Sequence, residues 1–555
     1  MKLIRLKILD DFRGLNSKFE INFRNDELNE DLSNFHPFCL AGLNGSGKSN
    51  VLEALANIFY HLECCTNGYP EYAFSPKEST PNAYQLEYFI INDTSSRKVE
   101  DLIKVKISKK KDSIPKMSID GEKFKIISET FGSSFLPDLV VAYSSGENET
   151  LSLPFVKMKL FQYDEYLKDF IGNKIYEKPK SSLLHINYEM SQAVLLTILL
   201  FFDDAIKPLQ KELGIENIQQ FTINLNNNWQ EIIIRQNSSS LDKFSNIVQA
   251  RTINESEYEK DDKKVIIRIL EHLSEQIKKL KDSATCSYLT DDYMSLDFWV
   301  DKNTKETIRN KFDNDPYKFF SVFQMLQALN ERVEELDEKN EIYNSKGYYT
   351  DYKRSEHNWF FYFTDYFITQ KNEDSNIEKK LLLKQLSDGE QQFLHTLGIC
   401  LMLQKKRTLL LLDEPETHFN PDWRSKFINI LRKTLEAGGD NFLLKDIILT
   451  SHSPFIISDC LPDKVIQFRK SINGVEAISA DNLKFKTFGA GVDYILQRFF
   501  GVNSLVSEYS REWIKNVIEN GTDNELREAI DFVGESDVKQ FLFSELYKRN
   551  KNANS

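Results

Sequence analysis

The chain has 555 residues, of which 41% are hydrophobic and 28% are charged. These values are close to those of ordinary globular proteins, so wholesale disorder and the fibrous classes are excluded. The formal net charge is −13, from 71 Lys and Arg against 84 Asp and Glu, which excludes a global attraction to nucleic acid and confines any such contact to a local surface.

Neither a membrane span nor a signal peptide is expected. The longest apolar run, 193–202, ends at two aspartates and is well short of the ~20 residues that a span needs. Charged residues interrupt the apolar ones over 1–10, so the apolar core of a signal peptide is missing. The 6 Cys show no CxxC spacing, which favours a reducing cytoplasm as the location.

The first part of the chain, 1–160, is predicted to be a lobe rich in strands. Apolar residues alternate over 1–10 and again over 19–23, which is typical of a hairpin. A short apolar run, 35–41, enters a Gly-rich loop, and apolar residues then recur at helical spacing from Ser49. Strand patterns return later, over 84–126 and over 139–143.

The segment 161–380 has a different composition, with many Asn, Lys and Glu, few Gly and long helical stretches. It is therefore predicted to be a mainly helical insertion. A rhythm of seven residues runs from Val322 to Leu336 but lasts for about two heptads, so a packed helix hairpin is favoured over a coiled-coil arm.

The segment 381–484 is predicted to be a second lobe, in which helices and strands alternate. The predicted elements are a helix, a very apolar strand, a second helix and a second strand, over 389–403, 409–412, 421–436 and 447–450. This order is typical of an α/β fold with a mostly parallel sheet. The remaining residues, 485–555, are predicted to form a short helical tail.

The Gly-rich loop 42–49, GLNGSGKS, fits the pattern GxxxxGK[ST] between a predicted strand and a predicted helix. In this pattern the backbone N–H groups wrap a phosphate, the lysine reaches the β and γ phosphates, and the final hydroxyl ligates Mg²⁺. ATP and Mg²⁺ are therefore the predicted ligands. The candidate nucleotide-binding residues are Asn44, Gly45, Gly47, Lys48 and Ser49, with Ser49 also a candidate metal ligand.

The apolar strand 409–412 ends in two carboxylates, Asp413 and Glu414. An α/β sheet places its ligand groups at the carboxyl ends of its strands. Asp413 is therefore predicted to assist Mg²⁺, and Glu414 to orient or deprotonate the attacking water.

Two further segments carry candidate residues. The sequence LSDGEQQ, 386–392, opens a predicted helix, where Ser387 and Gly389 offer a hydroxyl and free N–H groups to an anion. An ordinary helix cap is the alternative. The strand 447–450 delivers His452, which lies 39 residues after Asp413. A purely structural histidine is the alternative there.

Together the four motifs resemble those of the ATP-binding-cassette ATPases. LSDGEQQ is similar to the LSGGQ signature, in the variant with Glu at the last place that occurs in the SMC, Rad-fifty and RecF-like branch. DEPETHFNP, 413–421, resembles the DEPExHLHP segment of that branch. The resemblance covers about 1–160 and 381–470. A clear Q-loop is missing, with Gln162 as a weak candidate, and long coiled-coil arms are missing too.

The resemblance implies an ABC-type P-loop ATPase that dimerises around two ATP molecules. Lys48, Ser49, Asp413, Glu414 and His452 then act on the nucleotide of their own subunit, with His452 as the switch histidine that contacts the γ-phosphate. Ser387 and Gly389 complete the site across the dimer. Because Lys48 is expected to bring its positive charge to the β and γ phosphates, its side chain is expected at the surface.

Within the branch, the length, the run YSSGENE at 143–149, the compact insertion and the tail look most like the ATPase subunit of Septu-type antiphage systems, including versions encoded beside retrons. This implies a cytoplasmic homodimer, or a higher even-numbered assembly, that regulates a separate HNH nuclease. A retron reverse transcriptase with its RNA and DNA is a further implied partner where a retron is present. The helical insertion and the tail are expected to bind the partner, with Phe499 and Phe500 as anchors or, alternatively, as core residues.

Two alternatives remain open. A RecF-like DNA repair or recombination ATPase is one, because eight lysines over 104–125 give a local positive excess of five. Lysines that protect a strand edge from aggregation are the simpler explanation, and direct nucleic-acid contact stays open. An OLD-type nuclease is the second alternative, but the 18 residues after Asp537 are too few for its Toprim domain.

Overall fold

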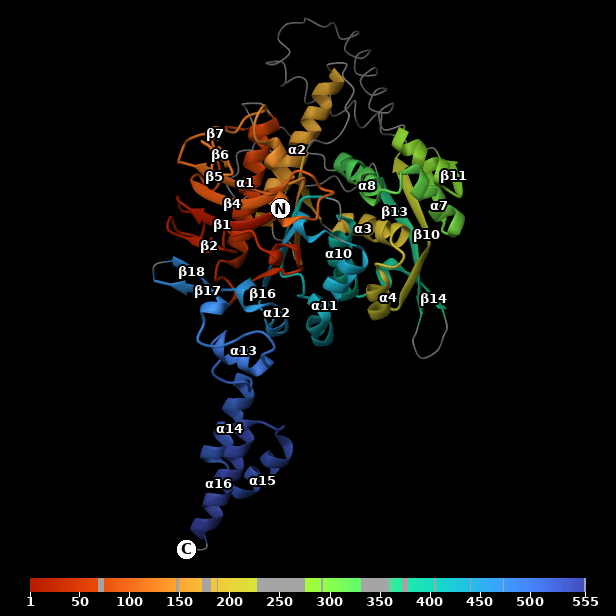
Figure 1. Ribbon diagram of the computed structural model, residues 1–555. Helices are drawn as coiled ribbons and strands as arrows, with labels where there is room; N and C mark the ends of the chain where they lie inside the picture. Colours follow the sequence, from red (N-terminus) through yellow and green to blue (C-terminus); the bar gives the residue numbers. More distant parts are fainter. Residues whose placement is uncertain are drawn as a thin grey trace, which may run out of the picture. The chain divides into compact units, whose positions relative to one another are not determined.

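The structure is a computed structural model that describes residues 1–67, 74–145, 149–171, 181–186, 188–226, 275–290, 293–330, 359, 361–371, 378–403, 406–439, 441–472 and 474–553. The chain divides into two compact units, Met1–Phe488 and Gly489–Ser555. Figure 1 shows the elements in chain order from red to blue.

A seven-stranded sheet forms the centre of the first unit, in the order β18-β17-β3-β16-β15-β8-β9. All neighbouring strands are parallel except the β17–β18 pair. In Figure 1 the late strands β16 and β17 lie beside the N-terminal elements, although they are far apart in sequence. The strands are β3 Phe38–Gly42, β8 Leu139–Ser144, β9 Leu183–His185, β15 Thr408–Asp413, β16 Lys445–Ser451, β17 Val465–Ser471 and β18 Gly474–Ser479.

This sheet confirms the predicted α/β fold with a mostly parallel sheet. Every residue of β3, β15 and β16 is buried, which explains why the apolar residues at the centre of these strands are consecutive rather than alternating. Because the three strands are parallel, their carboxyl ends meet at one edge of the sheet. Four helices are next to these strands in the chain. Helix α10 Asp388–Met402 comes before β15, and the helices that follow β3, β15 and β16 are α1 Lys48–Asn67, α11 Pro421–Ala437 and α12 Pro454–Asp459.

A second sheet is formed by strands from the N-terminal part of the chain. It is entirely antiparallel, and its strands run in the order β2-β1-β4-β5-β6-β7. Its first two strands are the predicted hairpin. One continuous core joins this sheet to α1, to helix α2 Glu149–Ile171 and to the central sheet. The strands are β1 Lys2–Ile8, β2 Glu20–Asn22, β4 Tyr84–Ile91, β5 Leu102–Lys109, β6 Lys116–Ile119 and β7 Lys125–Ile126.

The insertion contains a sheet that the sequence analysis missed. Its described helices include α3 Tyr188–Phe201, α4 Lys207–Leu213, α7 Lys302–Lys311 and α8 Pro316–Asn330. Its five antiparallel strands run in the order β11-β12-β10-β13-β14. They are β10 Ile215–Asn226, β11 Cys286–Leu289, β12 Tyr293–Trp299, β13 Phe361–Lys371 and β14 Glu378–Leu382.

The prediction of a mainly helical insertion is therefore wrong in leaving out these strands, and the reason is visible in β10. This strand carries several Asn and Gln residues, which are poor strand formers, and its pairing with β13 contains three register shifts that break the two-residue alternation. Pairing on both sides and the stacking of Phe221 on Phe298, at 4.3 Å between ring centroids, stabilise it instead. The later part of the predicted heptad rhythm, 331–336, lies outside the described residues.

The second unit, Gly489–Ser555, is built from α13 Val492–Arg498, α14 Glu508–Asn520, α15 Asp523–Phe532 and α16 Asp537–Ala553. The last three of these helices share a small core. Phe499 is only 4% exposed, which favours the core alternative over a role as a partner anchor. Across both units, none of the described helices has the length and apolar composition to cross a membrane.

Candidate functional site

The loop between β3 and α1 has the backbone that a phosphate-binding loop requires. Gly45 and Gly47 have φ of 70° and 98°, in the left-handed region that a side chain disfavours. A Cβ on Gly47 would also lie 2.9 Å from a methyl of Val475, on the β17–β18 hairpin. Asn44, at the tip of the loop, is exposed. The loop is thus held against the sheet on one side and open at its tip.

Lys48 does not lie at the surface, so that expectation is wrong. Its residue is 4% exposed, and its Nζ donates hydrogen bonds to the carbonyls of Gly42, at 3.0 Å, and Leu43, at 3.3 Å. The side chain folds back under the loop because the loop carbonyls are its nearest acceptors. Burial lowers the pKa of Lys48, and the nearby carboxylate of Glu414 opposes that effect.

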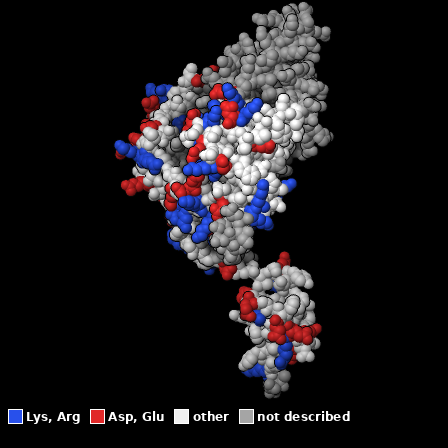
Figure 2. Space-filling model, turned by 90° about the vertical axis from the view of Figure 1, so that its right-hand side faces the viewer, with Lys and Arg blue, Asp and Glu red and all other residues white. Residues whose placement is uncertain are grey.

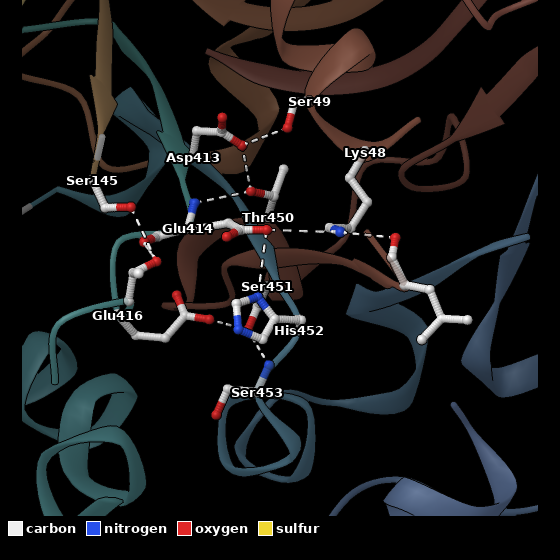
Figure 3. A network of polar contacts seen from close by, with 12 residues as sticks. Lys48, Ser49, Ser145, Asp413, Glu414, Glu416, Thr450, Ser451, His452 and Ser453 are labelled. Carbon is white, nitrogen blue, oxygen red and sulfur yellow. Dashed lines mark hydrogen bonds and ion pairs between the residues drawn. The ribbon is translucent and has the colours of Figure 1, made fainter. Parts of the chain in front are cut away.

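Ser49, Asp413 and Thr450 converge at the carboxyl ends of the strands. The Oδ1 atom of Asp413 accepts hydrogen bonds from the hydroxyls of Ser49, at 2.8 Å, and Thr450, at 2.6 Å. Ser49 and Asp413 are 364 residues apart in sequence, and the parallel register of β15 and β16 sets Asp413 opposite Thr450. Figure 3 shows the cluster.

The pair of Ser49 and Asp413 fits Mg²⁺, because a hydroxyl and a carboxylate are the hard oxygen ligands that this cation prefers. No group of three or more His, Cys, Asp and Glu that could hold a metal ion occurs in the part of the chain that the structure describes. A Mg²⁺ ion at this pair would therefore take its remaining ligands from phosphate oxygens and water, as is usual for this cation at nucleotide sites.

Glu414 and His452 lie in contact at the edge of the cluster. The Nδ1 atom of His452 lies 3.4 Å from Oε1 of Glu414, and Nζ of Lys48 lies 3.8 Å from the same oxygen. The contact with His452 lowers the pKa of Glu414, and the same contact raises the pKa of His452. Glu414 is thus ionised at neutral pH and able to accept a proton.

The backbone of Glu414 is strained, with φ of 48°. A non-glycine residue in this left-handed region costs on the order of 1 kcal/mol. The strain is held by the neighbouring strand, because the Glu414 N–H donates to the Thr450 hydroxyl at 2.9 Å. One hydroxyl, that of Thr450, therefore positions both carboxylate residues.

The segment LSDGEQQ forms the start of α10. Ser387 is the N-cap: its Oγ accepts from the Glu390 N–H at 3.3 Å, and the Ser387 N–H donates to Glu390 Oε2 at 2.7 Å. A Cβ on Gly389 would lie 2.6 Å from the His418 carbonyl, so glycine lets the loop after Glu414 approach the helix. Among the described residues, no hydrogen bond joins Ser387 or Gly389 to the P-loop.

Within one subunit, the helix-cap alternative accounts for Ser387. The structure brings Lys48, Ser49, Asp413, Glu414 and His452 together, and it leaves Ser387 exposed at the end of a helix. The weak Q-loop candidate Gln162 lies on α2. The residue after β8 that contacts the site is Ser145, whose hydroxyl donates to that of Thr417 at 3.0 Å.

Three residues that support the site from behind, Thr450, Ser451 and Glu416, were not predicted from the sequence. Glu416 is 1% exposed and accepts a hydrogen bond from the Ser451 hydroxyl. Burial raises its pKa to about 7. One feature of the sequence could have pointed to Glu416. It is the second Glu of the Asp-Glu-Pro-Glu run, because the roles assigned to Asp413 and Glu414 leave this third carboxyl group without a function.

Most of the lysines over 104–125 are engaged in ion pairs or hydrogen bonds within the fold. Lys109 is fully buried and donates to three oxygens of Lys77 and Asn82. Lys104 and Lys106 both lie within 4 Å of Glu87, at 3.7 Å and 3.6 Å. The hairpin therefore offers far less free positive charge than the count of lysines indicates, which weighs against the RecF-like alternative.

Comparison with known proteins gives two matches. Residues 241–458 match the family described as "AAA domain, putative AbiEii toxin, Type IV TA system". The chain is also 25% identical over 154 residues to "Protein ea59" of Escherichia phage lambda, which is 27% of this chain and 26% of that protein. The chain thus matches about a quarter of the length of this curated relative.

The matched segment contains Asp413, Glu414 and His452, whereas the P-loop lies before it. The match supports the coarser part of the predicted resemblance, an ABC-type AAA domain of the P-loop ATPases. It agrees with the mixed α/β fold and the parallel sheet, and it implies ATP binding.

Proposed function

We propose that this chain is an ABC-type ATPase that dimerises around ATP and regulates a partner HNH nuclease in an antiphage defence complex. The observation that carries the ATPase assignment is the convergence of Lys48, Ser49, Asp413 and Glu414 at one edge of the sheet. The toxin in the description of the matching family supports a defence role. A retron reverse transcriptase with its RNA and DNA joins the complex where one is encoded alongside.

In this proposal the phosphates of ATP lie on the P-loop. The Lys48 ammonium turns from the carbonyls of Gly42 and Leu43 to the β and γ phosphates, which are stronger acceptors. Ser49 and Asp413 hold Mg²⁺, which neutralises phosphate charge when bound. Glu414 takes the proton of the attacking water, and His452, in contact with Glu414, fixes the geometry of the pair.

The exposed position of Ser387 supports a site shared between two subunits. A signature motif that faces the partner's ATP makes hydrolysis depend on the dimer, so the specific activity should rise with protein concentration. Ser387→Arg protein is expected to be inactive by itself, because the long, positively charged arginine side chain blocks the face that the two subunits share. A steady-state ATPase assay checks this, with Arg527→Ala as a control on an exposed helix position of the other unit.

A mixture of Ser387→Arg and Lys48→Ala proteins tests the sharing directly. In a mixed dimer, one site carries both defects, and the other pairs an intact P-loop with an intact signature. Partial activity should therefore return when subunits exchange. If mass measurement demonstrates mixed dimers and the ATPase rate stays at the level of the single variants, the shared site is wrong.

The tail is the proposed partner-binding region. Large aromatic side chains are exposed on its helices, including Tyr509 at 80%, Phe532 at 81% and Tyr547 at 70%. Over 508–537 there are nine acidic and three basic residues, and Figure 2 shows acidic side chains on the visible face of this unit. Such an acidic surface repels nucleic acid and suits a positively charged protein partner. A nuclease that binds the phosphates of nucleic acid carries such positive charge.

Deletion of 506–555 is expected to release the partner without ending ATP hydrolysis, because the cut falls before α14 and leaves the P-loop unit whole. Phe532→Ala should weaken the complex while leaving the small core untouched. Co-purification with the neighbouring gene product, followed by an ATPase assay, measures both effects. Retention of the partner by the shortened chain would rule out the tail as its binding region.

A further inference from the structure

Glu416 is a buried carboxyl group that the proposed hydrolysis leaves without a role. It lies two residues after Glu414, in the loop between β15 and α11, and is 1% exposed. One oxygen, Oε1, accepts the Ser451 hydroxyl, while Oε2 has no hydrogen-bond partner among the residues that the structure describes. An ionised carboxylate with an unpaired buried oxygen is costly, so this environment favours the neutral acid.

The hydroxyl of Ser451 connects Glu416 to the switch histidine. It donates its proton to Glu416 and accepts the N–H of Ser453 at 2.9 Å. Ser451 and Ser453 are the two residues on either side of His452, as Figure 3 shows. Glu416 thus fixes the end of β16 and the start of α12 around the residue that faces Glu414.

The charges around Glu416 agree with a neutral acid. Glu414 faces it from the same loop, His452 from the end of β16, Lys48 from α1 and Cys39 from β3. Burial is the largest influence on its pKa and raises it to about 7. Ionisation would also add a second negative charge beside Glu414, which is the carboxylate that must accept a proton.

We infer that Glu416 is a positioning residue that works as a neutral acid: by accepting the Ser451 hydroxyl, it holds the turn that presents His452 to Glu414. This inference rests on the proposed hydrolysis of ATP. It distinguishes the two glutamates of the Asp-Glu-Pro-Glu run, one that must be charged and one that must not be.

The test compares glutamine with alanine at Glu416, together with alanine at Ser451 and glutamine at Glu414. Glu416→Gln should keep kcat within about twofold, because the amide oxygen still accepts the Ser451 hydroxyl and carries no charge. Glu416→Ala and Ser451→Ala should lower kcat by about 10-fold or more and leave KM for ATP nearly unchanged, since only the turn is lost. Glu414→Gln is the matched control and should be inactive.

Two kinetic outcomes would overturn the inference. If Glu416→Gln is as inactive as Glu414→Gln, the charge of Glu416 matters and the neutral acid is wrong. If Glu416→Ala and Ser451→Ala both keep the wild-type kcat, the turn needs no such support. Ser451→Ala removes one small hydroxyl, so it tests the same contact even if the alanine variant at 416 fails to fold.

A second measurement needs no hydrolysis. Because the folded pKa of Glu416 lies above its ordinary value of 4.5, the folded state binds more protons than the unfolded state between pH 4.5 and about 7. The wild-type protein therefore loses stability from this group as the pH rises through that window, whereas Glu416→Gln does not. The melting temperature of Glu416→Gln, relative to wild type, should rise between pH 5 and pH 8.

The two arms separate the inference from the proposed function. Absence of hydrolysis by the wild-type protein, with ATP binding intact, would contradict the proposed function alone. Parallel curves of melting temperature against pH for wild type and Glu416→Gln would overturn the neutral acid, whatever the ATPase rate.

Discussion

Lys48→Ala protein is expected to lose at least about 100-fold in ATP affinity. The ammonium group of Lys48 is the cation that the P-loop pattern places against the β and γ phosphates. Two charge-assisted hydrogen bonds of about 1.5–3 kcal/mol each account for a loss of this size. Isothermal titration calorimetry with ATP measures it directly.

The burial of Lys48 makes a structural control necessary. Lys445 is a second buried lysine, 2% exposed, and its Nζ donates to the Cys400 carbonyl. Lys445 is the first residue of β16, so it lies at the end of that strand opposite to the site. Lys445→Met should therefore lower the melting temperature and keep ATP binding. If Lys48→Ala binds ATP as the wild type does, the P-loop assignment is wrong. If both variants lose binding equally, the effect is loss of structure.

Glu414→Gln protein is expected to bind ATP and to hydrolyse it at least about 100-fold more slowly, because the water loses its general base while the phosphate and Mg²⁺ contacts persist. The substitution keeps the shape of the side chain and its backbone bond to Thr450. ATP-bound dimers should therefore accumulate. A single-turnover ATPase assay and light scattering with and without ATP measure the two effects.

The pKa values give this prediction a second readout. The raised pKa of His452 depends first on its contact with Glu414 and on the charge of that carboxylate. Removing that charge should therefore lower the pKa of His452 towards its ordinary value of 6.5. Titration of His452 by NMR checks this change. An unchanged pKa would show that the pair at 3.4 Å does not persist in solution.

The sequence by itself determined the features that depend on neighbouring residues. The run 42–49 specifies a phosphate-binding loop because its glycines and its lysine are contiguous. The leucines of β15 specify a buried strand, and their end places Asp413 and Glu414 together. The strand, loop and helix around the P-loop, the parallel sheet and the N-terminal hairpin were predicted for the same reason, since hydrophobic periodicity is a local pattern.

Only the tertiary structure decided the properties that depend on residues distant in the chain. Lys48 is buried because the loop carbonyls and Glu414, from a strand 366 residues later, surround it. The pKa of Glu416 is raised because the end of β16 and its neighbours bury the carboxyl group, and no local pattern encodes that burial. The sheet of the insertion forms because β10 pairs on both sides with distant strands, which compensates for a sequence with weak strand propensity.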